Sequence, residues 1–229
     1  MNEKLNSQEL RNLYRQDYVD RFARQSTRRI RRLLPYMNLS ATDIVADFAC
    51  GNGFLLDVIH DKVAHYHGVD FSEEFTAAAK QRHAEAETQN ASFECADIKD
   101  FCARNPGHFD KAFALDFSEH LYDDDFVSIF SAISKSLKPG GALYIHTPNG
   151  EYFLEILKNK GWLKQLPGHV SVRRGEAYVK LLQATGFSSI RLRYLPHYIS
   201  ILNCLHPLSC LPVIGKFFRA RLFIECSKS

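Results

Sequence analysis

A short apolar segment that runs directly into a glycine-containing loop constrains the fold of this chain more than any other feature. Residues 44–53 read Ile-Val-Ala-Asp-Phe-Ala-Cys-Gly-Asn-Gly, and an amphipathic stretch follows from Phe54 to Ile59. Glycines let a ligand approach the backbone, and the first turn of a helix offers N–H groups without intrahelical partners. The segment therefore predicts a strand, a ligand-binding loop and a helix over residues 53–60.

The spacing of small residues in this loop narrows the choice of ligand. An acid, Asp70, ends the next predicted strand, as in several nucleotide-binding folds. The dinucleotide fingerprint also needs a small residue at its sixth position, where the helix packs closely against the strand. Counting from Gly51 that position is Leu56, and counting from Ala49 it is Phe54. The loop therefore disfavours a pyrophosphate and favours a cofactor without one.

Four further motifs follow the loop in a fixed order. Residues 91–97 and residues 109–116 each read as a strand ending in an acid, and a Glu-His pair follows the second of them. A Pro-Gly-Gly turn and an apolar strand occupy residues 137–148, and residues 181–187 read Leu-Leu-Gln-Ala-Thr-Gly-Phe. Together with the loop, these motifs resemble the class I S-adenosylmethionine-dependent methyltransferases. The Glu-His pair is similar to that of the ubiquinone-type O-methyltransferase branch.

The resemblance covers about residues 40–195 and a last strand. It implies S-adenosylmethionine as the cofactor and S-adenosylhomocysteine as the product. Asp70 is expected to accept two hydrogen bonds from the ribose hydroxyls, and Phe71 to flank the adenine ring. Asp97 is expected to accept from the adenine amino group, while the backbone N–H of Ile98 donates to the ring.

The residues expected at the cofactor are Asp47, Ala49, Gly51, Gly53, Asp70, Phe71, Asp97, Ile98 and Asp116. Ala49 stands where the family more often has glycine, and its methyl group narrows the loop but still admits the cofactor. Asp47 is expected to orient the loop or to reach the cofactor amine through water. Two alternatives remain open: core packing for Phe71, and capping of a helix over residues 98–104 for Asp97.

Two histidines are candidates for removing a proton from the methyl acceptor, because a histidine pKa of ~6.5 suits a general base near neutral pH. His120 follows the fourth predicted strand, and Glu119 beside it is expected to orient the imidazole. His169 lies in an insertion near residues 161–173, which in relatives forms a wall of the substrate pocket. Helix capping or loop packing is the alternative for both histidines.

No metal site is predicted from the sequence. His65 and His67 lie on one face of a strand, but they lack a third ligand nearby in the chain. The acidic run Asp123–Asp125 is expected to cap the helix that starts near residue 124 rather than to bind a cation.

Predicted strands and helices alternate along the chain, which indicates a mainly parallel sheet with helices on both faces. The seven predicted strands lie near residues 44–49, 65–70, 91–96, 109–115, 142–147, 188–194 and 219–226. The predicted helices lie near residues 53–60, 73–87, 124–137, 150–160 and 174–185. We therefore predict an α/β, Rossmann-like fold that binds its ligands at the carboxyl ends of the strands.

The chain divides into an N-terminal helical cap over residues 1–37 and a methyltransferase domain over residues 38–229. The cap is predicted from apolar residues at helical spacing with arginines between them. In relatives such helices lie over the cofactor, so Tyr14, Tyr18 and Arg29 are candidates for contacts to its methionine end. Packing of the apolar face, with solvated arginines, is the alternative.

The segment 194–218 is rich in Leu, Ile and Phe, contains three prolines and has no charged residue before Lys216. A lid over the pocket, a contact surface for a membrane or a partner, and an excursion packed on the domain all fit this composition. The ends of the chain are basic: residues 1–37 carry nine Lys/Arg against four acids, and residues 185–229 carry six against one. Such ends could attract an anionic substrate, an acidic carrier or a membrane surface, and solvated helix faces are the alternative.

Motifs that are missing favour a small-molecule acceptor. The Asn/Asp-Pro-Pro-Tyr/Phe motif of amino-methylating nucleic-acid enzymes and the Pro-Cys pair of cytosine-C5 enzymes are both absent, so DNA is not expected and RNA is disfavoured. We predict O-methylation of an aromatic, quinone-like or sugar hydroxyl. N-methylation of a small molecule, or a non-catalytic cofactor-binding subunit that docks a partner, are the alternatives.

The cysteines and the first residues of the chain bear on the compartment. Six cysteines without a Cys-x-x-Cys pair indicate reducing conditions, and the polar first 15 residues lack the pattern of a signal peptide. We predict a cytoplasmic protein, with peripheral membrane contact through residues 194–218 as an option.

Overall fold

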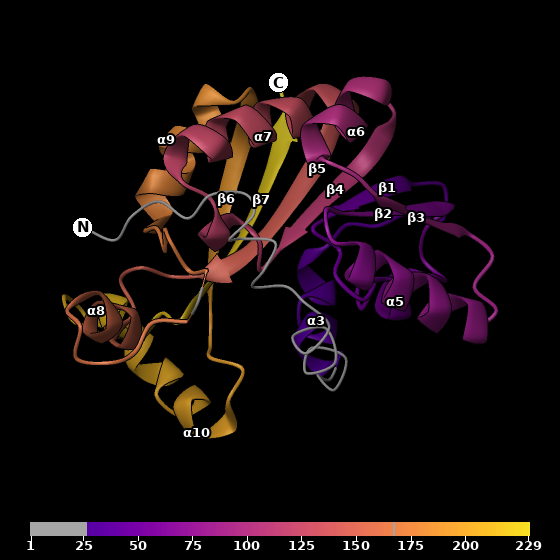
Figure 1. The fold of residues 1–229 in the computed structure, drawn as a ribbon. Coiled ribbons are helices and arrows are strands. Elements are labelled where there is room, and N and C mark those ends of the chain that lie inside the picture. The colour runs from indigo at the N-terminus through magenta and orange to yellow at the C-terminus, as the bar shows by residue number, and fades with distance from the viewer. Residues whose placement is uncertain (1–26, 167) are drawn as a thin grey trace.

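One seven-stranded sheet organises the molecule (Figure 1). The computed structural model describes residues 27–166 and 168–229. The strands are β1 (Ile44–Phe48), β2 (His65–Asp70), β3 (Ala91–Cys95), β4 (Phe109–Leu115), β5 (Leu137–Pro148), β6 (Phe187–Leu195) and β7 (Arg221–Lys228). Their order is β3-β2-β1-β4-β5-β7-β6, with β1 to β5 parallel and β7 antiparallel to both of its neighbours. The predicted α/β, Rossmann-like fold with a mainly parallel sheet is confirmed.

Helices cover both faces of this sheet (Figure 1). The α-helices are α3 (Arg28–Arg31), α4 (Leu56–Ile59), α5 (Glu73–Glu85), α6 (Ile98–Arg104), α7 (Asp123–Ser136), α8 (Phe153–Asn159), α9 (Gly175–Ala184) and α10 (Ser200–Asn203). Short 3-10 turns are η1 (Leu34–Tyr36), η2 (Ser118–His120), η3 (His206–Cys210) and η4 (Gly215–Phe218). Most of the predicted N-terminal cap, including Tyr14 and Tyr18, lies outside the described residues.

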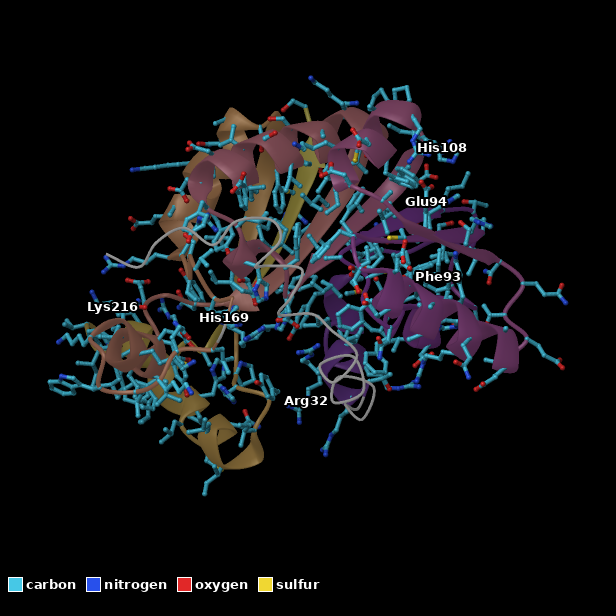
Figure 2. The ribbon with its side chains drawn as sticks, in the orientation of Figure 1. Arg32, Phe93, Glu94, His108, His169 and Lys216 are labelled. Atoms are coloured by element: carbon cyan, nitrogen blue, oxygen red, sulfur yellow. The ribbon has the colours of Figure 1, made fainter. Side chains whose placement is uncertain are left out.

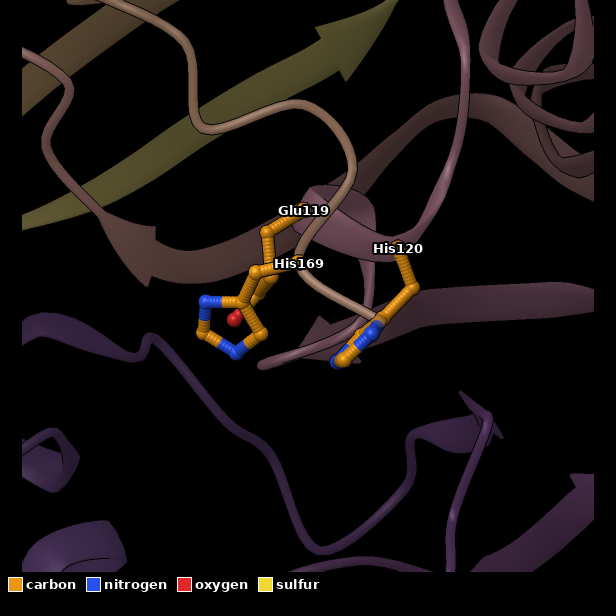
Figure 3. Close-up of side chains that lie close together, drawn as sticks. All are labelled: Glu119, His120 and His169. Atoms are coloured by element: carbon orange, nitrogen blue, oxygen red, sulfur yellow. The ribbon is translucent and has the colours of Figure 1, made fainter. Parts of the chain in front are cut away.

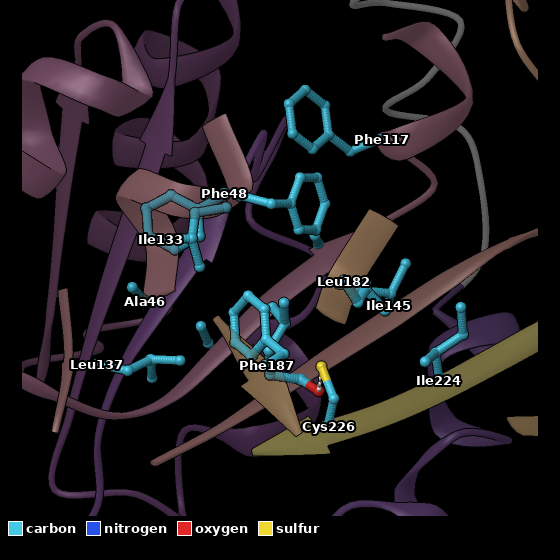
Figure 4. Packing of buried hydrophobic residues seen from close by; sticks show 14 of the residues in the cluster. Ala46, Phe48, Phe117, Ile133, Leu137, Ile145, Leu182, Phe187, Ile224 and Cys226 are labelled. Atoms are coloured by element: carbon cyan, nitrogen blue, oxygen red, sulfur yellow. Dashed lines mark hydrogen bonds between the residues drawn. The ribbon is translucent and has the colours of Figure 1, made fainter. Parts of the chain in front are cut away.

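Alternating side chains of the strands divide the core into two clusters. In β1, Ala46 and Phe48 face the cluster that also contains α6, α7 and α9, whereas Val45 faces the cluster beneath α3 and α4. Figure 4 shows part of the first cluster, to which β6 contributes Phe187 and β7 contributes Ile224 and Cys226. Because strands in the middle of the sheet are apolar on both faces, their ends are held rigidly.

Two local predictions need correction. The helix after β1 begins at Leu56, not at residue 53, because Gly51 (φ 53°) and Gly53 (φ 71°) adopt left-handed backbone conformations that a helix excludes. The acidic run Asp123–Asp125 does not cap α7: the N-cap residue is Tyr122, and the three acids occupy the first turn, where the helix dipole favours negative charge.

A lobe projects beyond the carboxyl ends of the central strands, and it consists of residues 153–166 and residues 196–218 (Figure 1). We call this part the α8–α10 lobe. Its two segments pack through aromatic rings: the Phe153 and Phe218 ring centroids are 6.1 Å apart, and Tyr152, next to α8, lies 6.0 Å from His197. Within the described residues, no helix has the length and apolar character needed to cross a membrane.

Candidate active site

The predicted site residues converge where the strand order reverses. From β1 the chain crosses to β2 on one side, and from β3 it returns to β4 on the other, so β1 and β4 are neighbours whose following loops diverge. Ligands of open α/β sheets bind in the crevice at such a switch point. Asp70 ends β2, Asp97 follows β3 and Asp116 follows β4, which brings the three strand-end acids to this edge.

The loop after β1 has a left-handed backbone at three positions, Ala49, Gly51 and Gly53. A Cβ atom at Gly53 would lie 2.8 Å from Nε2 of His83 and 3.0 Å from the Phe93 ring, so this position excludes any side chain. Ala49 adopts φ 58°, a conformation that glycine reaches without strain. The loop is therefore a tight backbone turn, as the sequence predicted.

Asp70 ties this loop to the end of β2. Its Oδ2 accepts a hydrogen bond from the Gly51 N–H at 3.0 Å, and its Oδ1 accepts one from the Ser72 N–H at 3.0 Å. Burial raises the pKa of Asp70 to about 6, against the effect of these hydrogen bonds. The Phe71 N–H also lowers the pKa of this carboxylate. A carboxylate offers about four acceptor positions, so acceptor capacity remains for a ligand hydroxyl. Phe71 beside it is exposed, so the core-packing alternative for its ring does not hold.

Asp47 is buried beside a partner that the sequence analysis did not identify. The hydroxyl of Tyr66 donates to Oδ2 of Asp47 at 2.6 Å. Burial raises the pKa of Asp47 to about 7, the Tyr66 hydrogen bond lowers it, and nearby Asp70 raises it further. The side chain thus supports the loop from within the sheet. A tyrosine in β2 gives no local sequence signal for this contact.

Asp97 is exposed and caps α6, where its carboxylate accepts from the Lys99 N–H at 2.7 Å. The capping alternative is therefore present in the structure, and one carboxylate can both cap a helix and accept from a ligand. Ile98 begins α6 and packs partly buried against the first core cluster.

Asp116 lies in a cluster of charged side chains rather than facing open solvent. Arg29 Nη1 lies 3.0 Å from its Oδ2, His146 Nδ1 lies 3.0 Å from its Oδ1, and Arg221 forms a hydrogen-bonded ion pair with it. Burial alone would raise the pKa of Asp116, but Arg29 and Arg221 hold it well below the ordinary value. Arg29, predicted at the cofactor, thus joins the N-terminal segment to the end of β4.

Glu119, His120 and His169 come together on the other side of this edge (Figure 3). His120 Nδ1 lies 2.9 Å from the Gly168 carbonyl oxygen; since a carbonyl only accepts, Nδ1 carries the proton and Nε2 carries the lone pair. The His120 and His169 rings are perpendicular, with centroids 5.0 Å apart. The Gly168 carbonyl orients the His120 ring, and it lies 48 residues further along the chain. The sequence did not indicate this contact.

The electrostatics of these three groups follow from their burial. Burial and the nearby Asp116 carboxylate raise the pKa of Glu119 to about 8, while Thr147 Oγ1 donates to Glu119 at 3.2 Å. Burial lowers the pKa of His120, and burial together with His120 lowers that of His169 to about 3. At neutral pH both imidazoles are therefore neutral proton acceptors and Glu119 is protonated.

The same three side chains have the ligand types of a divalent cation site. One ligand atom from each lies within 4.8 Å of the other two. Histidine nitrogen and carboxylate oxygen atoms are the ligand types that bind zinc in proteins. Neither a metal site nor this grouping was predicted from the sequence.

A buried arginine fixes the loop that carries Glu119 and His120. Arg173 donates to the carbonyl oxygens of Ser118 (2.9 Å) and Leu121 (2.6 Å), and its Nη2 lies 2.7 Å from Asp123. The Ser171 N–H also donates to the Glu119 carbonyl oxygen at 3.0 Å. The insertion near residues 161–173 is thereby attached to the end of β4, which brings His169 to His120.

Comparison with known proteins adds a family match. Residues 45–141 match the family model described as a methyltransferase domain. The chain is 29% identical over 126 residues to a ubiquinone biosynthesis O-methyltransferase of Thiobacillus denitrificans, covering 54% of this chain and 53% of that protein. It is 31% identical over 105 residues to the protein of that name from Idiomarina loihiensis, covering 46% and 42%. The chain thus spans about half the length of the curated relatives it matches.

Solved structures share the whole fold at low sequence identity. A SAM-dependent methyltransferase from Archaeoglobus fulgidus superposes with a TM-score of 0.67 at 17% identity, covering 90% of this chain and 96% of that one. Phosphoethanolamine N-methyltransferase 2 from Haemonchus contortus, in complex with S-adenosyl-L-methionine, gives 0.67 at 19% identity, with 99% and 60% covered. The [4+2]-cyclase SpnF gives 0.68 at 17% identity, with 97% and 96% covered. Since that cyclase shares the fold, the fold alone does not define the reaction.

Proposed function

We propose that this chain, a class I S-adenosylmethionine-dependent methyltransferase by its fold and its family match, methylates a hydroxyl group of a small aromatic, quinone-like or sugar molecule. The ubiquinone biosynthesis O-methyltransferases that it resembles support an oxygen acceptor. The observation that carries the proposal is a pair of neighbouring histidines with lowered pKa values: His120 follows β4, and His169 lies in the insertion near residues 161–173. β4 is a neighbour of β1, the strand that the glycine loop follows.

The residues around the loop fit the cofactor. The tight backbone at Gly51 and Gly53 offers close approach, and Asp70 is held with lone pairs available for the ribose hydroxyls. Phe71 and Asp97 are exposed near the adjoining strand ends, as an adenine-binding wall requires. When bound, S-adenosylmethionine supplies a methyl group already activated by its sulfonium.

The tasks left to the protein are alignment of the acceptor and removal of its proton. His120 is the better proton acceptor of the two histidines, because the pKa of His169 falls to about 3. Its Nδ1–H is fixed on the Gly168 carbonyl, so Nε2 is the atom that accepts the hydroxyl proton. His169, perpendicular to it, is assigned to holding the acceptor, and protonated Glu119 to donating a hydrogen bond.

The substrate side of the proposal also includes the nature of the acceptor. The α8–α10 lobe lies beyond the strand ends and carries many apolar side chains, which suits an apolar or aromatic acceptor. His169 lies between this lobe and the sheet (Figure 2). An acceptor that enters along the lobe therefore meets the histidine pair before the glycine loop.

The test is incubation of the protein with methyl-labelled S-adenosylmethionine and an extract of its source cells, followed by mass spectrometry. Label in a low-mass phenol, quinol or sugar supports the proposal. Label confined to RNA, protein or an amine overturns the acceptor class, and no label despite measurable cofactor binding favours a non-catalytic role.

A second arm of this test concerns the histidines. Changing both His120→Ala and His169→Ala is expected to reduce turnover at least a hundredfold while cofactor affinity, measured by calorimetry, stays within threefold. His108→Ala is the matched control, since His108 is exposed and precedes β4 at the opposite end of the strand. Full activity of the double variant would contradict the role of a dedicated base.

A further inference from the structure

Exposed apolar side chains are concentrated in one part of the described residues, the α8–α10 lobe. Eleven large hydrophobic side chains are exposed in the described chain, and ten of them lie in residues 162–166 and residues 198–214. Trp162 is 74% exposed, Ile201 78% and Val213 86%. Single exposed apolar residues are ordinary on a protein surface, but a gathering of this kind marks an interaction site.

The exposed charged residues of the lobe have a single sign, because its one acid, Glu155, is buried and paired with Lys158. Residues 157–166 and residues 196–218 contain no Asp or Glu. Lys160, Lys164 and Lys216 are exposed among the apolar side chains, with Lys216 visible at the edge of the lobe in Figure 2. The surface is therefore apolar and cationic, and it is complementary to a surface that is apolar and anionic.

Aromatic rings and lysines lie in the arrangement that membrane interfaces favour. The Lys160 ammonium lies 5.6 Å from the centroid of the Trp162 ring, and that of Lys216 lies 5.3 Å from the Phe217 ring. Lysine side chains can lay their methylene stems on apolar groups and keep the ammonium at the headgroup level, where tryptophan and tyrosine also prefer to lie. Tyr198 is exposed on the same lobe.

We propose that the α8–α10 lobe is a peripheral docking surface for a bilayer that contains anionic phospholipids. The apolar side chains of its two segments enter the headgroup region, and the lysines bind the lipid phosphates. Lysines near an anionic surface and apolar side chains that enter the headgroup region both strengthen such binding. An acidic protein partner would match the charge but would not require so many bulky apolar side chains on a surface that has no exposed acid.

The surface is also continuous with the proposed acceptor side, since α8 and the insertion that carries His169 belong to one stretch of chain after β5. A lipid-soluble acceptor would reach the histidines from the bilayer without crossing water. Docking itself does not depend on methyl transfer, so it is tested without cofactor or acceptor.

The test uses the only tryptophan of the chain, Trp162, as a built-in probe. The full chain is mixed with vesicles of phosphatidylcholine alone or of phosphatidylcholine with phosphatidylglycerol at three to one, and binding is followed by flotation and tryptophan emission. We expect flotation with the anionic vesicles, a blue shift of the emission, and quenching by lipids brominated high on the acyl chain. Flotation without any blue shift, or equal binding to neutral vesicles in high salt, would overturn the proposal.

Two pairs of variants sharpen this result. Ile201→Ser with Val213→Ser, and Lys160→Glu with Lys216→Glu, are each expected to lower vesicle affinity at least tenfold. Lys80→Glu with Lys135→Glu, both exposed outside the lobe, makes the same charge change and is expected to lower it less than threefold. Equal effects of the two lysine pairs would reduce the interaction to general charge attraction. A concentration-dependent blue shift without vesicles, with a doubled mass in solution, would show an interface between copies of the chain instead.

Discussion

The loop after β1 and the loop after β4 follow neighbouring strands, yet they are held in place in different ways. The first is held by groups close in the fold of one βαβ unit: Cys50 N–H donates to Val69 O, and Gly51 N–H donates to Asp70. The second is held by side chains from β5, β7 and the insertion near residues 161–173. The proposed cofactor side is thus a backbone turn, whereas the proposed acceptor side is a cluster of side chains.

From this difference we can predict which substitutions each of the two loops tolerates. A backbone turn is sensitive to the conformation that each residue must adopt, and it accepts many side chains that do not disturb that conformation. A buried cluster of charged and polar groups is sensitive to the loss of any one member, because its partners are then left unpaired. Variants on the two sides should therefore fail for different physical reasons.

The largest effect is expected at Asp116. Asp116→Asn removes the carboxylate that faces Arg29, Arg221 and His146, so two buried or half-buried guanidinium groups lose their counter-charge. We expect the free energy of unfolding in urea to fall by about 3 kcal/mol or more. Arg104→Gln removes the exposed pair with Glu94, a hydrogen bond to the Asp100 carbonyl and a contact with the Phe101 ring, and should lower the free energy of unfolding by no more than about 1 kcal/mol. If the two variants lost similar free energy of unfolding, the charged cluster around Asp116 would not be more sensitive than an exposed ion pair, and the comparison would fail.

A pH effect of intermediate size is expected from Asp47. Its pKa is about 7 in the folded chain and near 3.8 when unfolded, so between these values the folded state holds a proton that the unfolded state has lost. Stability from this group is complete below pH 3.8 and is lost as pH rises through 7, by roughly 1.4 kcal/mol per pH unit inside the window. From pH 5.5 to pH 7 the loss is therefore about 2 kcal/mol.

Asp47→Asn is expected to remove the contribution of Asp47 to this slope, since the amide oxygen still accepts from Tyr66 but cannot ionise. Asp70 and Glu119, whose pKa values burial also raises, keep contributions of the same sign. Urea denaturation at pH 5.5, 7 and 8 gives the free energy of unfolding at each pH and therefore this slope. Asp61→Asn, at an exposed carboxylate, serves as the control and should leave the slope of the wild type unchanged. An unaltered slope in Asp47→Asn would mean that other groups set the pH dependence.

A smaller effect is expected on cofactor affinity from Asp70. Asp70→Asn keeps the shape of the side chain but removes one acceptor oxygen and the charge, so calorimetry should give an S-adenosylmethionine Kd about tenfold higher. Asp97→Asn should raise it no more than about threefold, because asparagine caps α6 as well as aspartate does. A larger loss at Asp97 than at Asp70 would reverse the roles assigned to the two acids.

The smallest effect is a gain in stability at Ala49. Ala49→Gly relieves a left-handed backbone conformation at φ 58° and is expected to raise the free energy of unfolding by about 0.5–1 kcal/mol. Ala46→Gly, in the regular strand β1 just before it, should lower stability instead, through lost packing and backbone entropy. Destabilisation by both changes would show that the Ala49 methyl group contributes packing that outweighs its strain.

On the proposed cofactor side, the strands, the loop and the positions of the strand-end acids could be predicted well from the chain itself. Strand-end acids and loop glycines are contiguous motifs, and β1, β2 and β4 begin at the predicted residues. Two features of this side were not predicted. One is the backbone conformation that delays the start of α4 to Leu56, and the other is the cross-strand hydrogen bond from Tyr66 to Asp47. Both depend on how the strand and its neighbour are finally placed.

The acceptor side illustrates the limit more clearly. The sequence identified Glu119, His120 and His169 one by one, but nothing local indicates that His169 would lie against His120 or that Gly168 would orient it. Asp116 and Arg221 are separated by 105 positions in the chain. Their pairing follows from the antiparallel insertion of β7 beside β5, which no short-range pattern contains.

Three features could be read from the sequence alone: the alternation of strands and helices, the positions of the acids at the strand ends, and the apolar composition of residues 194–218 in the α8–α10 lobe. These features arise from periodicity and turn chemistry, which act over a few residues. The tertiary structure was needed to show which distant side chains are in contact. It therefore also showed which histidine ring is oriented, which acids are buried and which apolar residues are exposed. Those outcomes depend on packing, because the burial and the partners of a group are properties of everything around it.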